Sequence, residues 1–193
     1  MDNLIGKNTD TRQETLFSEL IEKLKSYNIP LKQWGTGEAK KINHLAKEVA
    51  EGESTLIDKD GEIIRSVGLV HIDVLYKAGD LNLQLIEDRQ EFKGGRIRRR
   101  ELTGISEKLK PGENPLTSAK RSLTEELGID EECLVEDLGI NEKIQVSPSY
   151  PGLKTLYTKH EMLTYLPRSA FRIDGYTEVQ PDKNTFFIWK KIE

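Results

Sequence analysis

The sequence contains little of what disulfide-rich, zinc-binding or membrane-spanning proteins need. A single cysteine, Cys133, cannot form a disulfide within the chain. The three histidines, His44, His71 and His160, are too scattered to have the spacing of a zinc site. No run of about 18 apolar residues occurs, and the N-terminal segment MDNLIGKNTD lacks the apolar core of a signal peptide. We therefore expect a cytoplasmic protein with no membrane-spanning segment.

An excess of positive charge is also missing. The 193 residues include 29 Lys and Arg and 33 Asp and Glu, which gives a formal net charge of -4. That balance argues against a general nucleic-acid coat, although a local basic patch can override the mean. Hydrophobic residues make up 36% and charged residues 32%, which is typical of a soluble, folded protein with a heavily charged surface. The length suits one medium-sized domain with an appendage.

Residues 1–58 form the predicted appendage, an N-terminal helical extension. Apolar residues recur at helical spacing between residues 11 and 27, and Pro30 ends the pattern because proline cannot continue a helix. A second apolar stripe, between residues 42 and 49, follows the glycines of WGTGEAKK and indicates a second helix. We favour a role in covering the sheet of the next domain, since an amphipathic helix must bury its apolar stripe. A separate binding function is the alternative.

The remaining residues, 59–193, are predicted to form one α/β domain. After the turn-like segment DKDG, period-two alternation over residues 70–76 and 81–85 predicts two strands joined by the turn AGDLN. The segment SPSYPG is expected to be a loop. Further strands are expected at residues 138–146, 155–165 and 184–192.

A capped helix is predicted between the strands, within KPGENPLTSAKRSLTEELGI. Asn114 can cap the exposed backbone donors, Pro115 fits the first helical position, and Gly128 is a typical stop. Four apolar residues fall on one stripe at about 100° per residue and should face the core. They are Leu116, Ala119, Leu123 and Leu127.

Three carboxylates can converge around this helix, from Glu113 just before the cap and from Glu125 and Glu126 near the end. Carboxylate oxygens are the ligands that Mg²⁺ or Mn²⁺ prefers. Arg121 lies four residues before Glu125, near enough to pair with it and fix its rotamer. The alternative is a solvated helix face, because glutamates are good helix formers.

The stretch from Glu107 to Ile129 resembles the signature of Nudix hydrolases. That signature is a glycine, five residues, a glutamate, seven residues, then Arg-Glu-apolar-x-Glu-Glu-x-Gly-apolar. Glu113 aligns with the first glutamate, and the segment RSLTEELGI, which begins at Arg121, aligns with the last part. The resemblance implies a Nudix-like α/β/α sandwich with a mixed sheet, in which the loop and helix hold divalent metal ions. It also implies hydrolysis of a nucleoside diphosphate linked to another moiety.

Two residues depart from the signature. Glu107 stands where the signature has a glycine, and Ser122 replaces the first glutamate of the Arg-Glu pair. In the family that glutamate usually helps to hold the metal, so the neutral hydroxyl of Ser122 removes one charge from the site. Mg²⁺ commonly takes only one or two protein carboxylates together with substrate phosphates, so chemistry can survive this loss. Glu107 can bring a replacement carboxylate into the same loop.

The resemblance therefore assigns roles to five residues. Glu125 and Glu126 are expected metal ligands, Glu113 a ligand or an orienting group, and Glu107 a substitute ligand. Arg121 is expected to orient Glu125, and Arg121, Glu125 and Glu126 together form the predicted catalytic group. The leading hypothesis is a metal-dependent hydrolase acting on a diphosphate-containing small molecule. The rival is a Nudix-like module that lost turnover and binds a ligand or another protein.

A cluster of arginines precedes the signature. On a strand, Arg96, Arg98 and Arg100 would share one face, where guanidinium groups can bind phosphates in a bidentate way. The alternatives are an edge strand protected by charge, or RNA binding through the same strand. Tyr150 and Trp34 are loop aromatics that can stack on a base or anchor their loops to a core. The predicted substrate-binding residues are Arg96, Arg98, Arg100 and Tyr150.

Overall fold

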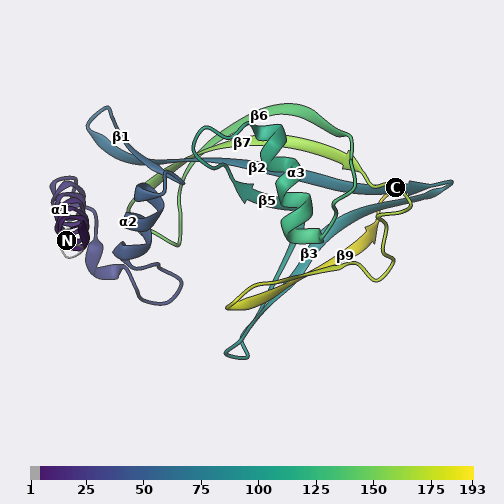
Figure 1. The fold of residues 1–193 in the computed structure, drawn as a ribbon, viewed down its shortest axis with the longest axis horizontal. Helices are drawn as coiled ribbons and strands as arrows, with labels where there is room; N and C mark the ends of the chain where they lie inside the picture. Colours follow the sequence, from purple (N-terminus) through teal and green to yellow (C-terminus); the bar gives the residue numbers. More distant parts are fainter. Residues whose placement is uncertain (1–4) are drawn as a thin grey trace. The chain divides into compact units, whose positions relative to one another are not determined.

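The computed structural model describes residues 5–193, which form two compact units (Figure 1). Unit 1 combines Met1–Val67 with Glu142–Tyr157, and unit 2 combines Gly68–Asn141 with Thr158–Glu193. Long strands contribute residues to both units, and sequence periodicity does not reveal where a strand changes its neighbours. These strands are β2 (Glu62–Ala78), β6 (Val135–Val146) and β7 (Lys154–Tyr165).

Unit 1 contains the helices predicted from the N-terminal periodicity, α1 (Ile5–Ser26) and α2 (Ile42–Ala50), and both are confirmed. A short 3₁₀ turn, η1 (Leu31–Gln33), follows α1. A small core holds the unit together, formed by Leu24, Trp34, Leu45, Ile63, Tyr150 and Leu153. Within residues 5–193, no helix is long and apolar enough to cross a membrane.

The predicted turn DKDG joins β1 (Thr55–Lys59) to β2 as a tight hairpin. Lys59 pairs with Glu62, so the loop has only two residues, Asp60 and Gly61. Both have positive φ, 54° and 76°, as a type I′ hairpin turn requires. An Asp-Gly pair meets this demand because glycine carries no Cβ and aspartate tolerates the left-handed region.

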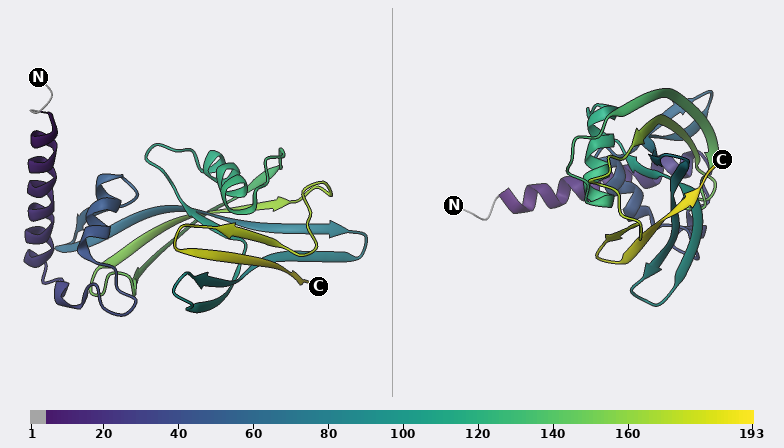
Figure 2. Two further views of the ribbon diagram at one scale, coloured as in Figure 1. Left: turned by 60° about the horizontal axis from the view of Figure 1, so that its bottom comes forward. Right: turned by 90° about the vertical axis from the view of Figure 1, so that its right-hand side faces the viewer.

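The strands belong to one nine-stranded sheet in the order β6-β7-β2-β3-β9-β8, with β1 and β5 paired to β2 and β4 paired to β3. The unit 2 parts of β2 and β7 run in the same direction, whereas β2 and β3 are antiparallel (Figure 2). The predicted α/β class with a mixed sheet is confirmed. The other strands are β3 (Leu81–Phe92), β4 (Ile97–Thr103), β5 (Ile105–Lys108), β8 (Tyr176–Val179) and β9 (Lys183–Lys191).

Strand β2 changes partner along its length, and this opens space beside it. Its residues Leu69–Ile72 pair with β5, whereas Leu75–Ala78 pair with β3. Gly104, with φ 58°, makes the corner between β4 and β5, and a Cβ there would lie 1.9 Å from the carbonyl oxygen of Ile72. Only glycine permits this approach. The corner directs the side chains of β3, β4 and β5 toward one region.

Helix α3 (Pro115–Leu127) is the predicted capped helix, and its ends are confirmed. The Asn114 side chain accepts a hydrogen bond from the Leu116 backbone N–H at 2.9 Å. Gly128 adopts φ 63°, and the next backbone N–H, that of Ile129, donates to the Leu123 carbonyl at 3.2 Å. This left-handed stop satisfies carbonyls at the end of the helix.

The buried face of α3 differs in part from the predicted stripe. Ala119, Leu123 and Leu127 join the core of unit 2, as predicted. Leu116 is 41% exposed, so its assignment to the core was wrong. Ser118 and Ser122 are fully buried, which shows that the contact face is rotated from Leu116 toward the serines. The prediction placed the apolar side chains of the helix on its buried face. Such a pattern does not reveal small polar residues that pack tightly against a sheet.

Removing the cap of α3 is expected to lower stability moderately. Asn114→Ala leaves the Leu116 N–H without its side-chain acceptor, at a cost of about 1 kcal/mol in the free energy of unfolding. Urea unfolding followed by circular dichroism measures this change. Thr117→Ala, an exposed position in the same first turn, is the matched control. Equal stability of the two variants would show that the cap contributes nothing.

Candidate active site

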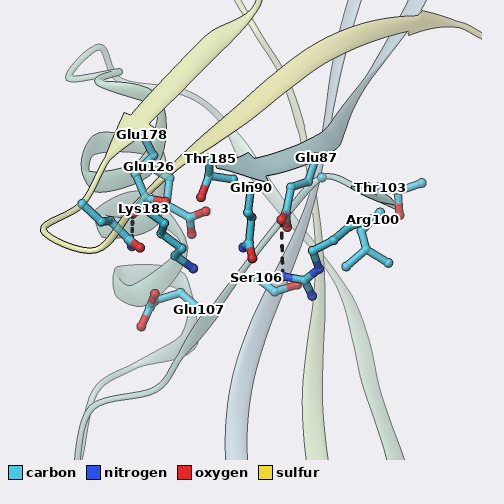
Figure 3. A pocket seen from close by; sticks show the side chains of 13 residues that line it. Glu87, Gln90, Arg100, Thr103, Ser106, Glu107, Glu126, Glu178, Lys183 and Thr185 are labelled. Carbon is cyan, nitrogen blue, oxygen red and sulfur yellow. Dashed lines mark hydrogen bonds and ion pairs between the residues drawn. The ribbon is translucent and has the colours of Figure 1, made fainter. Parts of the chain in front are cut away.

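A polar cavity of about 190 Å³ lies in unit 2, where β3, β4, β5, α3 and the β8–β9 hairpin come together (Figure 3). Two cationic side chains line it, Arg100 and Lys183. Carboxylates from four different elements also line it. They are Glu87, Glu107, Glu126 and Glu178. A cavity with both charges is suited to an anionic ligand held together with a metal cation.

Glu126 is the most perturbed carboxyl group of this cavity. Its Oε1 atom is buried and has no hydrogen-bond partner within the described part of the chain. Burial raises the pKa of Glu126 to about 9, and the nearby charges of Glu178, Glu107 and Glu87 add to this rise. At neutral pH the group therefore holds a proton until a cation or another positive charge compensates it.

Glu107 contributes a second perturbed carboxyl group from β5. Burial is the main cause that raises its pKa, and the charge of Arg121 acts in the opposite direction. Glu87 is partly neutralised, because Arg100 donates to its Oε1 at 3.3 Å. The strongest unbalanced negative charge would thus arise where Glu126 and Glu107 ionise together.

These carboxylates have the chemistry that Mg²⁺ or Mn²⁺ requires, and the Oε1 of Glu126 has no hydrogen-bond partner in the described chain that would compete with a cation. No three Asp, Glu, His or Cys side chains of residues 5–193 lie close enough together to hold a metal ion by themselves. The residues therefore fit a Mg²⁺ ion that takes one or two protein oxygens and completes its shell with phosphate oxygens and water.

Arg121 organises the other signature glutamates on a different side of α3. Its Nε and Nη2 donate to the two carboxylate oxygens of Glu113 at 2.9 and 3.0 Å, and its Nη1 donates to Glu125 at 2.8 Å. Nη2 also reaches the Lys108 carbonyl at 3.3 Å and the Ser118 hydroxyl at 3.2 Å. The bidentate pair lowers the pKa of Glu113 to about 2.

The expected convergence of Glu113, Glu125 and Glu126 on one metal ion is corrected by this geometry. Glu113 and Glu125 converge on Arg121, whereas Glu126 lines the cavity. Successive helical residues are about 100° apart, so the adjacent Glu125 and Glu126 point in different directions. The expected pairing of Arg121 with Glu125 is present.

Ser122, the residue that departs from the signature, is fully buried. Its hydroxyl donates to the Ser118 carbonyl at 2.8 Å, one helical turn earlier, and it does not line the cavity. Glu107, the other departure, does line the cavity. The signature positions thus supply Glu126 from the helix and Glu107 from the preceding strand.

The arginine cluster lies on β4 and in the turn before it. Arg100 lines the cavity, and Arg98 pairs in register with the cavity-lining Gln90, so both are on the cavity side of the strand. Arg96 lies in the turn with its guanidinium 4.1 Å from the centre of the Phe92 ring. Of the predicted substrate-binding arginines, the structure therefore brings Arg100 into the site and Arg98 beside it.

The assignment of Tyr150 as a ligand-stacking residue is corrected. Tyr150 belongs to unit 1 and is 0% exposed, with its ring centre 5.0 Å from that of Trp34. The guanidinium of Arg65 covers the ring at 5.0 Å. Both loop aromatics anchor the core of unit 1, which is the alternative that the sequence left open.

Several cavity residues were not found from the sequence. Glu178 and Lys183 come from the last hairpin, about fifty residues after the signature, and no local motif marks them. Ser106 also lines the cavity, and its hydroxyl is 2.8 Å from Nδ1 of His71 on the neighbouring strand. The strand sequences YTEV of β8 and KNTFFIWKK of β9 do not alternate polar with apolar residues, so periodicity gave no signal either.

Comparison with known proteins places the chain near several solved structures. No family model and no curated protein matches the sequence. The chain is similar to an Ap4A hydrolase from C. elegans, with 12% identity over 65% of this chain and 80% of that one and a TM-score of 0.38. It is also similar to the NUDIX domain of Shewanella oneidensis NrtR in complex with ADP ribose, with 11% identity over 76% and 82% of the two chains and a TM-score of 0.43.

A third similar structure is the E. coli dihydroneopterin triphosphate pyrophosphohydrolase, with 20% identity, coverage of 64% and 79%, and a TM-score of 0.39. Scores this low do not carry activity or ligand from these proteins to this chain. The mixed sheet packs against α3, the helix of the segment that resembles the Nudix signature. In the described part of unit 2, α3 is the one α-helix against that sheet.

Proposed function

We propose that this protein is a metal-dependent hydrolase of a diphosphate-containing nucleotide derivative or a related small molecule. One observation carries the proposal: Glu126, whose Oε1 is buried and unpartnered, lines a cavity together with three other carboxylates and two cations. A group whose pKa is raised to about 9 by burial and like charge is typical of a functional site. The similarity to the Nudix signature supports the same reaction class.

Five cavity residues have a role in this proposal. Glu126 and Glu107 hold Mg²⁺ or Mn²⁺, and Arg100 and Lys183 bind phosphate oxygens of the substrate. The bound ion offsets phosphate charge and lowers the pKa of a water molecule. In this proposal Glu178, which lines the same cavity, accepts the proton that the attacking water loses.

The Arg121 group acts from outside the cavity. Arg121 holds Glu113 and Glu125 and also bonds to the carbonyl of Lys108, next to Glu107. It thereby fixes the end of β5 relative to α3, which carries Glu126. A shift of about 1 Å between two such ligands would weaken metal binding and turnover severely. Arg121 is accordingly a positioning residue.

A second function, ligand binding without turnover, is favoured by one specific observation. Ser122 removes a signature carboxylate, and the described residues contain no group of three preformed metal ligands. Such a module would hold the phosphates of a ligand through Arg100 and Lys183 alone. Its binding would persist when divalent metal is removed.

A phosphate-release screen separates the two functions. Purified protein is incubated with nucleoside diphosphate derivatives and Mg²⁺ or Mn²⁺, and the products are resolved by ion-exchange chromatography. If the protein is a metal-dependent hydrolase, it should cleave the diphosphate linkage, and EDTA should stop this cleavage. Ligand binding in calorimetry with no cleavage of any compound would instead establish the binding module.

A further inference from the structure

The hairpin beside the cavity carries cations that nothing in the described part of the chain neutralises. Arg89, Arg99 and Arg100 are paired with carboxylates of β3. Lys93 and Arg98 are exposed, and within residues 5–193 their side chains make no hydrogen bond or ion pair. Both lie on the hairpin beside the cavity, in a chain whose net charge is -4. They favour an anion supplied by a ligand.

Arg98 lies on the same side of β4 as the cavity. It pairs in register with Gln90, whose side chain lines the cavity, and it is two residues from Arg100, which also lines it. Residues that alternate on a strand share a face and are about 7 Å apart. Arg99 points to the opposite face, where its Nη1 donates to Asp88 at 3.2 Å.

The spacing from Arg100 to Arg98 exceeds the separation of two phosphates that share one bridging oxygen. Arg100 is held in the cavity by Glu87, so Arg98 is free to bind an anionic group further out. Beyond it, Arg96 lies over the Phe92 ring, an arrangement that also suits stacking of a base or sugar against the guanidinium plane.

We propose that the ligand carries a further phosphate, separated by a sugar from the phosphate bound in the cavity, and that Arg98 binds it. This rests on the proposed function only in that the cavity takes the first phosphate. A nucleoside bisphosphate and the 5′ end of an RNA strand both have this chemistry. Lys93 and Arg96 at the hairpin tip extend the same surface and would bind later phosphates of a strand.

The test measures binding at low salt, both in EDTA and with Mg²⁺, because the cavity can need the ion to take the first phosphate; chromatography of the probes shows whether any is cleaved. The probes are inorganic pyrophosphate, a nucleoside 3′,5′-bisphosphate and a short single-stranded oligoribonucleotide with a 5′ phosphate. Arg98→Met is compared with Arg99→Met, the adjacent arginine on the opposite face. Thermal unfolding confirms that both variants remain folded.

We expect Arg98→Met to weaken the bisphosphate and the oligonucleotide about tenfold and to leave pyrophosphate binding unchanged. In Arg98→Met, the slope of log K against log salt concentration for oligonucleotide binding should fall by about 1, as expected for the loss of one phosphate contact. Equal effects of Arg98→Met and Arg99→Met would overturn the proposal, as would absence of bisphosphate and oligonucleotide binding by the wild type. If the oligonucleotide binds more tightly than the bisphosphate and loses that advantage in Lys93→Ala, the ligand is an RNA strand. If the two bind with equal affinity, the ligand is a small molecule.

Failure of this proposal and failure of the proposed function give different results. If Arg98 binds no second phosphate, metal-dependent cleavage of a simple diphosphate derivative remains intact. If the protein is no hydrolase, bisphosphate binding through Arg98 persists without cleavage.

Discussion

Glu126→Gln is expected to lower metal-dependent turnover by at least about 100-fold without unfolding the protein. Glutamine has the shape of the protonated carboxyl group that burial favours at neutral pH, so the cavity should keep its structure. It cannot become an anion and therefore cannot hold the cation. The measurement combines phosphate release with calorimetric titration of Mg²⁺ in the presence of a slowly hydrolysed diphosphate analogue.

The same substitution should change how stability depends on pH. The folded pKa of Glu126 is about 9, above its ordinary value of 4.5, so folding takes up a proton between those values. The free energy of unfolding then falls as pH rises from about 5 to 9, and Glu126→Gln should flatten this slope. Mg²⁺ binding by the wild type should release a proton that the variant does not release.

Glu125→Gln is the matched control for both measurements. Glu125 is the neighbouring glutamate on α3, but its side chain is 52% exposed and bonds to Arg121. We expect a smaller loss of turnover from it than from Glu126→Gln and an unchanged slope of stability against pH. Equal turnover of Glu126→Gln and the wild type would remove Glu126 from the site.

The sequence predicted α3 well because the signals for a capped helix are local. Asn114 caps the backbone donors, Pro115 fits the first helical turn, and Gly128 takes the left-handed φ at the end of the helix. These requirements hold whatever the helix packs against. Leu116 shows the limit of that reasoning, because exposure depends on which face of the helix meets the sheet. That face is decided by tertiary packing.

The cavity could be predicted only in part, because its residues come from six elements. Glu126, Glu107 and Arg100 lie in or near the signature segment and were found. Glu178 and Lys183 depend on the pairing of β8 with β9 and of β9 with β3, which no local pattern reveals. The separation of Glu125 from Glu126 follows from helix geometry, but choosing which one faces the cavity required the structure.

Tyr150 marks the opposite error, a functional reading of a structural residue. Its loop sequence SYPG resembles that of an exposed binding loop, but the ring is buried beside Trp34. Burial also raises the pKa of its hydroxyl, and the charge of Glu48 adds to that rise. Loop aromatics serve both purposes, and only the packing around them distinguishes the two.

Arg121→Met is expected to destabilise the protein strongly, by about 3 kcal/mol in the free energy of unfolding. The guanidinium is only 16% exposed and bonds to Glu113, Glu125, the Lys108 carbonyl and Ser118. Its removal leaves the Glu113 carboxylate, 11% exposed, with only the Lys110 backbone N–H as a donor. Methionine fills similar volume but donates no hydrogen bond.

The pH dependence of stability identifies the pair that causes the loss. The pKa of Glu113 is lowered to about 2, so its contribution is present above about pH 4.5 and disappears as pH falls toward 2. Arg121→Met should therefore differ most from the wild type near neutral pH and approach it in acid. Urea unfolding at several pH values measures this, with Arg99→Met as an exposed control expected to cost less than about 0.5 kcal/mol.

A double-mutant cycle with Glu113→Gln completes the test. If the bidentate pair accounts for most of the loss, the double variant should be less destabilised than the sum of the single variants, by about 1 kcal/mol or more. Additive losses would show that Arg121 acts through Lys108 and Ser118 instead. Turnover of Arg121→Met should also fall. The guanidinium bonds to the Lys108 carbonyl and so fixes the end of β5, next to Glu107, relative to α3, which carries Glu126.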